Sequence, residues 1–169
     1  LDGLPVLELP TDHRRSSSQT FAGSLQHVGL EKPLLSSLRR MSREQGVTLF
    51  VTVLTAFKIL LHRYTGQEDI GVAVPVSVRD NRALQSMVGL FVNTLLVRTD
   101  LSGDPTFREL LARVHQVVQD AYAHQDLPYT QVVADRKPER ETGHPPLAQV
   151  MFSMVNVPVS RLKLPRVTA

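Results

Sequence analysis

An amide and a hydroxyl interrupt an apolar run in the middle of the chain. Asn93 and Thr94 lie within residues 88–98, whose other side chains are mostly apolar and predict a β-strand. Successive side chains of a strand face opposite ways, so Asn93 shares a face with Leu95 while Thr94 faces the other side. A buried amide without a hydrogen-bond partner costs about 1 to 3 kcal/mol. We therefore expect Asn93 either to be a structural amide that bridges strands or to point into a lined cavity.

Histidine could also support acid–base chemistry, but no two of the six histidines are adjacent. They occur singly, as His13, His27, His62, His115, His124 and His144. His124 ends one expected helix and Asp126 begins the next, where the helix dipoles favour a cation and a carboxylate respectively. We therefore expect a structural role for His124 and Asp126. His115 is expected to face solvent, because it lies opposite the apolar side of its helix.

Hydrophobic patterning predicts helices that alternate with strands, which indicates the α/β fold class. The expected helices cover residues 33–45, 48–64, 104–122 and a short segment around Pro128, and the expected strands cover 24–30, 70–76, 88–98 and 149–157. Thr48 should cap the second helix, which is apolar nearly all round and therefore central and buried. Pro75 requires its strand to lie at a sheet edge or to leave the pairing there. Residues 10–20 and 136–146 are expected to form surface loops.

Composition restricts the classes of protein to which the chain can belong. Its 169 residues are 42% hydrophobic, which is enough to form a core. The absence of cysteine excludes disulfides and thiolate metal sites. The net charge of +3 is spread among 16 acidic residues, so we expect no nucleic-acid partner. Because no apolar run reaches the roughly 20 residues that cross a bilayer, and no charged leader precedes one, we expect a cytoplasmic protein without a membrane partner.

Five motifs occur in order along the chain. They are Gly46 to Phe50, Leu60 to Asp69, Val88 to Arg98, His124-Gln125-Asp126-Leu127-Pro128-Tyr129, and Pro145 to Phe152. Together these motifs resemble the condensation domain of nonribosomal peptide synthetases, and the match runs from about Leu7 to Val157. The sequence Phe-Val-Asn-Thr-Leu at residues 91–95 resembles the peptide-bond-forming branch of that family more than its epimerising or heterocyclising relatives.

This resemblance implies a chloramphenicol-acetyltransferase-like α/β sandwich with two lobes and a substrate tunnel between them. Carrier domains would deliver an acyl thioester and an acceptor amine on phosphopantetheine arms, with no cofactor bound directly. The family's catalytic His-His-x-x-x-Asp-Gly motif is absent from this sequence, whose only Asp-Gly is Asp2-Gly3. We therefore expect the carboxyl-terminal lobe of the domain, which supplies tunnel wall and carrier-docking surface, has no catalytic residue and is inactive alone.

Three residues are candidates for contacts with the tunnel or a carrier. The resemblance implies that the loop after the 70–76 strand approaches the tunnel, so Ser77 and Arg79 could contact a substrate or its carrier. Asn93 is the third candidate, if its amide points into the tunnel. The alternative for the loop is a solvated turn, because Asp80 and Asn81 are ordinary turn residues.

The expected organisation is one partial condensation domain over residues 1–169. Residues 1–20 are a linker or loop, 21–158 an α/β lobe, and 159–169 a truncated tail. The expected partners are the missing amino-terminal lobe, peptidyl carrier domains and the adenylation domain of the parent chain. Without the other lobe, some of the sheet would lack neighbours, so the chain should be marginally stable alone. Two alternatives stay open: a free-standing, non-catalytic module that binds carriers, and an unfolded pseudogene product.

Overall fold

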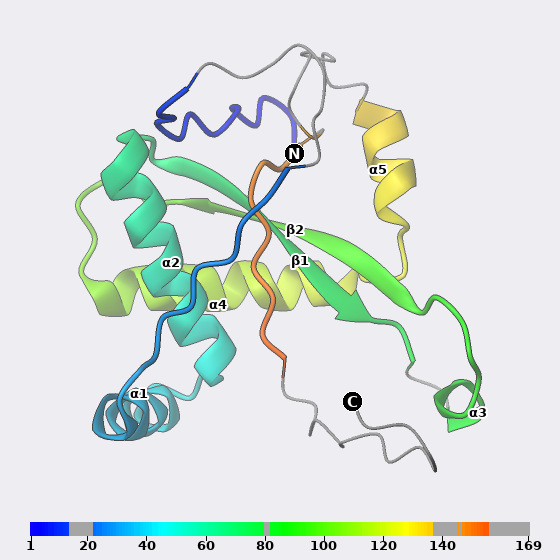
Figure 1. Ribbon diagram of the computed structural model, residues 1–169, viewed down its shortest axis with the longest axis horizontal. Helices are drawn as coiled ribbons and strands as arrows, with labels where there is room; N and C mark the ends of the chain where they lie inside the picture. The colour runs from blue at the N-terminus through cyan, green and yellow to red at the C-terminus, as the bar shows by residue number, and fades with distance from the viewer. Residues whose placement is uncertain (14–21, 80–81, 137–144, 146, 156–169) are drawn as a thin grey trace.

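A computed structural model describes residues 1–13, 22–79, 82–136, 145 and 147–155. Its elements follow one another as α1 (Lys32–Glu44), α2 (Leu49–Thr65), β1 (Asp69–Ser77), α3 (Arg82–Gln85), β2 (Val92–Asp100), α4 (Phe107–Ala123) and α5 (Tyr129–Arg136). The strands cross the centre of the molecule, and α3 and α5 lie toward the end where β1 stops and β2 starts (Figure 1). This mixture of helices and strands agrees with the expected α/β class.

Local sequence signals set the ends of α2. The hydroxyl of Thr48 accepts the backbone N–H of Val51 at 3.3 Å, so Thr48 caps the helix as predicted. Gly66 ends the helix in the left-handed conformation, with a φ of 71°. One side of α2 is deeply buried, as expected, but Leu60 and Tyr64 are exposed, so the described residues do not cover it all round.

The helix expected to start at Asp104 begins at Phe107. Thr106 is its N-cap and forms a capping box with Glu109, in which each side chain accepts the backbone N–H of the other residue. Asp104 has a φ of 48°, which is a left-handed conformation that cannot belong to the helix. The buried face of α4 is made by Leu110, Leu111, Val114 and Val118.

β1 and β2 form an antiparallel pair that explains the position of Pro75. Their register runs from Asp69 opposite Asp100 to Ser77 opposite Val92. On the outer side of β1, Ala73 donates to the Val150 carbonyl at 3.0 Å and accepts the Phe152 N–H at 2.8 Å. Because backbone directions repeat every second residue, the nitrogen of Pro75 also faces outward. The pairing with β2 therefore needs no N–H from Pro75, which agrees with the predicted edge position.

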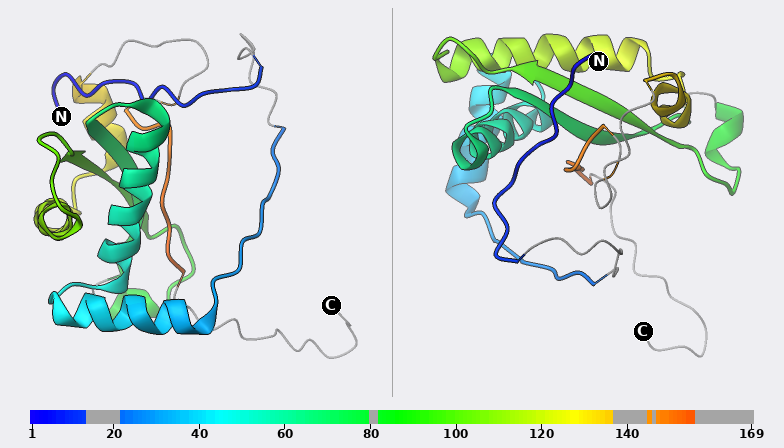
Figure 2. Two further views of the ribbon diagram at one scale, coloured as in Figure 1. Left: turned by 90° about the vertical axis from the view of Figure 1, so that its left-hand side faces the viewer. Right: turned by 90° about the horizontal axis from the view of Figure 1, so that it is seen from above.

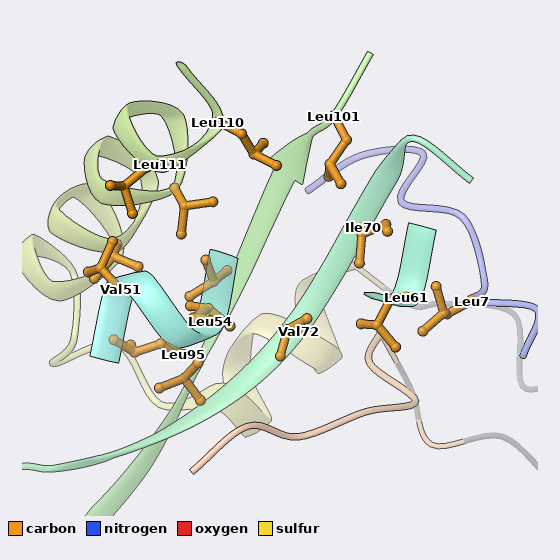
Figure 3. Close-up of a cluster of buried hydrophobic side chains, with 14 of the residues drawn as sticks. Leu7, Val51, Leu54, Leu61, Ile70, Val72, Leu95, Leu101, Leu110 and Leu111 are labelled. Carbon is orange, nitrogen blue, oxygen red and sulfur yellow. The ribbon is translucent and has the colours of Figure 1, made fainter. Parts of the chain in front are cut away.

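The hydrophobic core lies between the sheet and the helices α2 and α4 (Figure 3). Alternate strand residues face it, and Val72 and Val97, which are opposite each other, are both almost fully buried. The core consists of Leu7, Val51, Leu54, Leu61, Ile70, Val72, Val74, Val76, Leu95, Val97, Leu101, Leu110, Leu111, Val114 and Val118. Phe152 adds aromatic contacts with Phe50 and Phe57, at centroid distances of 5.5 and 5.6 Å.

Three strand predictions need correction. Residues 24–30 form no strand, because no neighbouring strand lies beside them in the described structure. The strand expected from Val88 begins at Val92, because residues 84–89 are drawn into a turn by Arg79. The strand expected over 149–157 is a single bridge at Met151 in its described part, and residues 156 and 157 lie outside the described residues.

Two further expectations can be compared with the described residues. No single helix among them is long and apolar enough to cross a bilayer, and α1 and α2 reach that length only together, across a bend of 107°. No group of three or more histidine, aspartate or glutamate side chains in the same part of the chain could hold a metal ion. Most of the predicted 136–146 loop and all of the 159–169 tail lie outside the described residues.

Candidate functional site

The three candidate residues lie at one end of the sheet but not on one face. Asn93 is opposite Val76 in the register, one residue before Ser77. Since side chains alternate along a strand, Asn93 faces the helices α2 and α4 together with Val76, whereas Ser77 faces the opposite side. Ser77 is exposed and Arg79 is half-buried just beyond the end of β1. The end of the sheet therefore brings Ser77 and Arg79 together and directs Asn93 elsewhere.

Arg79 holds the segment that leads into β2. Its Nη1 donates to the carbonyls of Leu84 at 2.6 Å and Met87 at 2.7 Å, and its Nη2 donates to Gly89 at 3.3 Å. The guanidinium carbon also lies 4.3 Å from the ring centroid of Phe91, a cation–π distance. A planar group with five donors suits such a set of carbonyls. Through these contacts Arg79 stabilises the turn at residues 84–89, and its side chain does not extend freely into solvent.

Asn93 uses its whole amide on the connection between α4 and α5. Nδ2 donates to the carbonyls of Gln125 at 2.7 Å and Leu127 at 2.8 Å, and Oδ1 accepts the N–H of Tyr129 at 3.0 Å and of Thr94 at 2.9 Å. The amide is therefore structural, as the first alternative predicted, but it joins a strand to a helix connection rather than two strands. This connection contains the Gln-Asp-Leu-Pro-Tyr part of the fourth motif, so the third and fourth motifs meet at Asn93.

Lys58 is a fully buried lysine on the core side of α2, where the sequence predicts only an apolar helix. Its Nζ donates to the carbonyls of Ile70 on β1 and Val97 on β2, both at 2.8 Å. Burial lowers the pKa of Lys58 from 10.5 to about 7, although the nearby Asp69 carboxylate opposes this shift. Its spacing from Leu54 and Leu61 places it on the buried stripe of the helix, and that spacing was the available signal.

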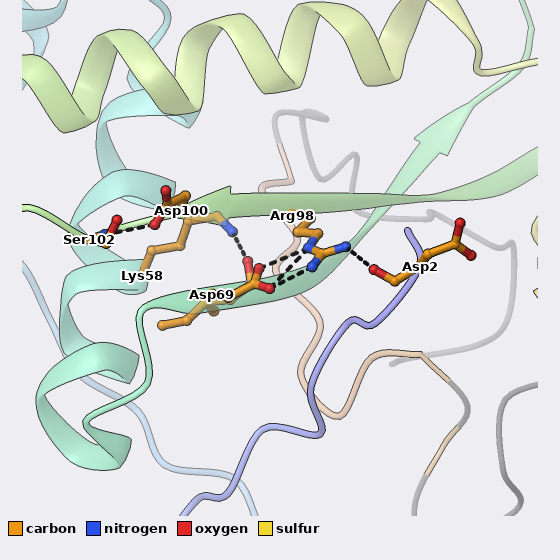
Figure 4. Close-up of polar contacts among 7 residues, drawn as sticks. Asp2, Lys58, Asp69, Arg98, Asp100 and Ser102 are labelled. Carbon is orange, nitrogen blue, oxygen red and sulfur yellow. Dashed lines mark hydrogen bonds and ion pairs between the residues drawn. The ribbon is translucent and has the colours of Figure 1, made fainter.

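Arg98 ties the amino-terminal segment to the sheet (Figure 4). Its Nη2 and Nε donate to the two carboxylate oxygens of Asp69 at 2.6 and 2.9 Å, and its Nη1 donates to the Asp2 carbonyl at 2.8 Å. These hydrogen bonds with Asp69 raise the pKa of the Arg98 guanidinium. Asp69 and Arg98 are diagonal neighbours across the strands, a relation that appears only once the register is known. Arg136 of α5 also pairs with Asp2.

Two histidine predictions have different outcomes. The ring of His124 lies 2.8 Å from the Asp120 carbonyl at the end of α4, which agrees with the expected structural role. His115 is half-buried, so it faces solvent only in part. It lines a cleft of about 650 Å³ between α1, α2 and α4, with Phe50, Tyr122 and Met154 among the other lining residues.

Two long helices cover one face of the sheet, and a turn and a helix connection that carry two of the motifs lie at one end of this α/β arrangement. The family model described as "Condensation domain" matches residues 1–166, so the chain belongs to the condensation-domain family. Its described structure is accordingly part of a chloramphenicol-acetyltransferase-like fold, as expected from the motifs.

Three relatives illustrate the similarity. A component of the linear gramicidin synthase of Brevibacillus parabrevis is 49% identical over 152 residues, which cover 90% of this chain and 3% of the relative. A four-domain nonribosomal peptide synthetase solved with AMP and glycine gives a TM-score of 0.87 at 29% identity, over 90% of this chain and 12% of that chain. The X-domain from teicoplanin biosynthesis gives 0.81 at 26% identity, over 86% of this chain and 32% of that chain. The chain thus spans only a small part of each relative.

Proposed function

We propose that this chain is part of the second lobe of a nonribosomal peptide synthetase condensation domain. The observation that carries the proposal is the family match over residues 1–166. The sequence has no adjacent histidine pair, which supports placing the family's His-His-x-x-x-Asp-Gly motif in the other lobe of the parent domain. The chain alone is then inactive. In the complete domain it forms part of the wall of the substrate tunnel, and the histidine of the other lobe promotes the reaction.

The reaction of the complete domain is amide formation between two carrier-bound substrates. The acceptor amine attacks the carbonyl of the donor thioester, a C–N bond forms and the C–S bond breaks. The sulfur leaves as a thiolate on the donor's phosphopantetheine arm, and the proton lost by the amine balances the one that converts this thiolate into a thiol. The histidine of the other lobe promotes or positions this attack. Orientation of the two reactants is the main contribution that a tunnel wall can make.

The end of the sheet at Ser77 is the part that we assign to the tunnel wall. Ser77 is exposed there, and Arg79 holds the adjoining turn by three hydrogen bonds to its carbonyls. The turn places Val88 and Leu90 in exposed positions despite their apolar side chains. An apolar surface held in a defined shape suits contact with an acyl chain or with the other lobe. Asn93 positions the neighbouring α4–α5 connection and touches no substrate itself.

The partners follow from the same proposal. Carrier domains deliver both substrates on phosphopantetheine arms, an adenylation domain of the parent chain activates the amino acid, and no cofactor binds to this lobe directly. The gramicidin relative is a synthase subunit, and the solved four-domain synthetase provides a multidomain precedent. We place the parent protein in the cytoplasm, where these substrates are made.

A bulky side chain at Ser77 tests the assignment of the tunnel wall. In the complete condensation domain with loaded carriers, Ser77→Trp should lower the rate of amide formation at least about tenfold, because it fills the substrate path. Ser36→Trp, at an exposed position of α1, is the matched control and should leave the rate unchanged. Circular dichroism checks that both variants are folded. Equal rates for Ser77→Trp and the unmodified domain would remove Ser77 from the tunnel.

A further inference from the structure

The cleft that His115 lines has the size of a small-molecule site. It opens where α1 meets the first turn of α2, and Figure 2 shows α1 lying across the amino-terminal end of α2, with a bend of 107° between the two helices. The second half of α4 and Met154 form its other walls. The cleft therefore lies on the helix side of the sheet, whereas Ser77 faces the opposite side. Its volume of about 650 Å³ falls within the range of about 300 to 1,000 Å³ that is usual for ligand pockets in proteins.

The floor of the cleft is apolar and is held in place by the core. Val51 and Val118 line it and are only 2% and 6% exposed, as members of the hydrophobic core. The Phe50 ring packs against Phe152, with 5.5 Å between the ring centroids. Met154, whose flexible side chain can adapt to the shape of a ligand, also lines the cleft. Because these side chains are already packed, the floor presents a preformed apolar surface to the body of a ligand.

The remaining walls carry polar side chains that have no partner in the described part of the chain. Four of them line the cleft, and none forms a hydrogen bond or an ion pair with another described residue: Arg39, His115, Gln119 and Tyr122. By contrast, the neighbouring Arg40 is paired with a glutamate of the same helix. None of the described residues that line the cleft is acidic, so Arg39 gives it a net positive charge. The free donors and this charge favour a ligand with an anionic group.

We propose that this cleft binds a small carboxylate that carries an aliphatic or aromatic body. The carboxylate lies against Arg39, whose planar guanidinium can donate two parallel hydrogen bonds to it, and the side chains of His115 and Tyr122 supply further donors. The apolar body lies on Phe50 and Met154, where its surface is removed from water. The inference adds a ligand site on the helix side of the sheet, and it does not rest on the tunnel wall proposed above.

Titration of the complete condensation domain with decanoate tests the site. Decanoate joins a carboxylate to an aliphatic chain, and isothermal titration calorimetry should give a dissociation constant of about 1 mM or tighter. Decyltrimethylammonium carries a chain of the same length with a positive charge, and it should bind at least about tenfold more weakly because Arg39 repels it. No measurable binding of decanoate, or equal affinities for the two probes, would overturn the proposal.

Two pairs of variants locate the binding. Arg39→Gln should weaken decanoate binding at least about tenfold, whereas Arg43→Gln, which changes an exposed arginine of α1 outside the cleft, should leave it unchanged. Gln119→Trp fills the cleft from α4 and should abolish binding, whereas Gln116→Trp, at an exposed position of the same helix, should retain it. Unchanged affinity in Arg39→Gln or in Gln119→Trp would place decanoate elsewhere and contradict the proposal. Amide formation is measured on the same samples and bears only on the proposed function.

Discussion

The backbone N–H of Tyr129 donates to Oδ1 of Asn93 at 3.0 Å, so a side chain of β2 holds the first residue of α5. The same amide donates to the Gln125 and Leu127 carbonyls before Pro128, so the three contacts together hold the connection on both sides of its proline. The relation spans 36 residues of sequence and joins two family motifs. The polar residue in the apolar strand is thus explained by a contact that no local pattern reveals.

Replacing Asn93 tests these hydrogen bonds between β2 and the α4–α5 connection. Asn93→Ala should lower the free energy of unfolding by about 1 to 3 kcal/mol, because it leaves partners of the amide without hydrogen bonds. Asn93→Asp should cost more at pH 7, since a carboxylate cannot donate to the two carbonyls and repels them. Urea unfolding followed by circular dichroism measures both. Gln116→Ala, which breaks only an exposed contact with Asp120, is the control and should change stability little.

Lys58 makes the stability of the chain depend on pH. Its folded pKa of about 7 is below the unfolded value of 10.5, so between these values the unfolded state binds more protons than the folded state. Stability should therefore rise with pH above 7, by about 2 to 3 kcal/mol between pH 7 and 9.5 if Lys58 acts alone. Well below pH 7, Lys58 is protonated in both the folded and the unfolded state, and this contribution stays at its minimum.

The variant Lys58→Met isolates this effect. It removes the titrating amine while keeping a long side chain in the core, so the rise in stability between pH 7 and 9.5 should be lost. Lys32→Met changes an exposed lysine at the start of α1 and should leave the rise in place. Urea unfolding at the two pH values gives the comparison. A Lys58→Met chain that keeps the full pH dependence would mean that other groups cause it.

Arg98 should be required for docking of the amino-terminal residues. Arg98→Gln removes the paired contacts with Asp69 and the hydrogen bond to the Asp2 carbonyl. Because the ion pair is partly exposed, we expect a loss of only about 1 kcal/mol in stability, but faster hydrogen exchange at residues 4–9. Arg40→Gln breaks a more exposed pair with Glu44 and should affect neither quantity. Unchanged exchange in Arg98→Gln would show that packing alone holds the segment.

Arg79 should control the shape of the turn before β2. Arg79→Lys keeps the charge but cannot reach three carbonyls in the same planar geometry, so the amides of residues 84–91 should exchange faster. In the complete domain the rate of amide formation should fall about 10- to 100-fold if this turn forms part of the tunnel wall, as we propose, because the wall then loses its shape. Arg63→Lys, at an exposed position of α2, should have no effect on either. An unaltered rate with faster exchange would separate the turn from the reaction.

Local signals predicted much of the fold. The cap at Thr48 and the left-handed Gly66 defined α2, and the β-branched run predicted β1, because these features depend on residues close in sequence. The apolar run from Val88 misled the prediction of β2, since Arg79 draws that run into a turn through contacts at longer range. A strand also needs a neighbour, which explains why residues 24–30 form none in the described structure.

The site was harder to predict than the fold. The sequence indicated that Asn93 needed hydrogen-bond partners, but not that they lie at Gln125 to Tyr129 on another element. The pair of Arg98 with Asp69 depends on the register of two strands. Lys58 could have been assigned to the core from its helical spacing, but only the packed structure supplies the two carbonyls that accept its hydrogen bonds.

Amide formation by separated and complete forms of the domain tests the central claim most directly. Carrier domains loaded with a donor thioester and an acceptor amine are mixed with this chain alone or with the complete condensation domain, and the product is measured by mass spectrometry. We expect product with the complete domain and none above background with residues 1–169 alone. Product formed by the isolated chain would contradict the proposed function, because it would place the catalytic group within residues 1–169.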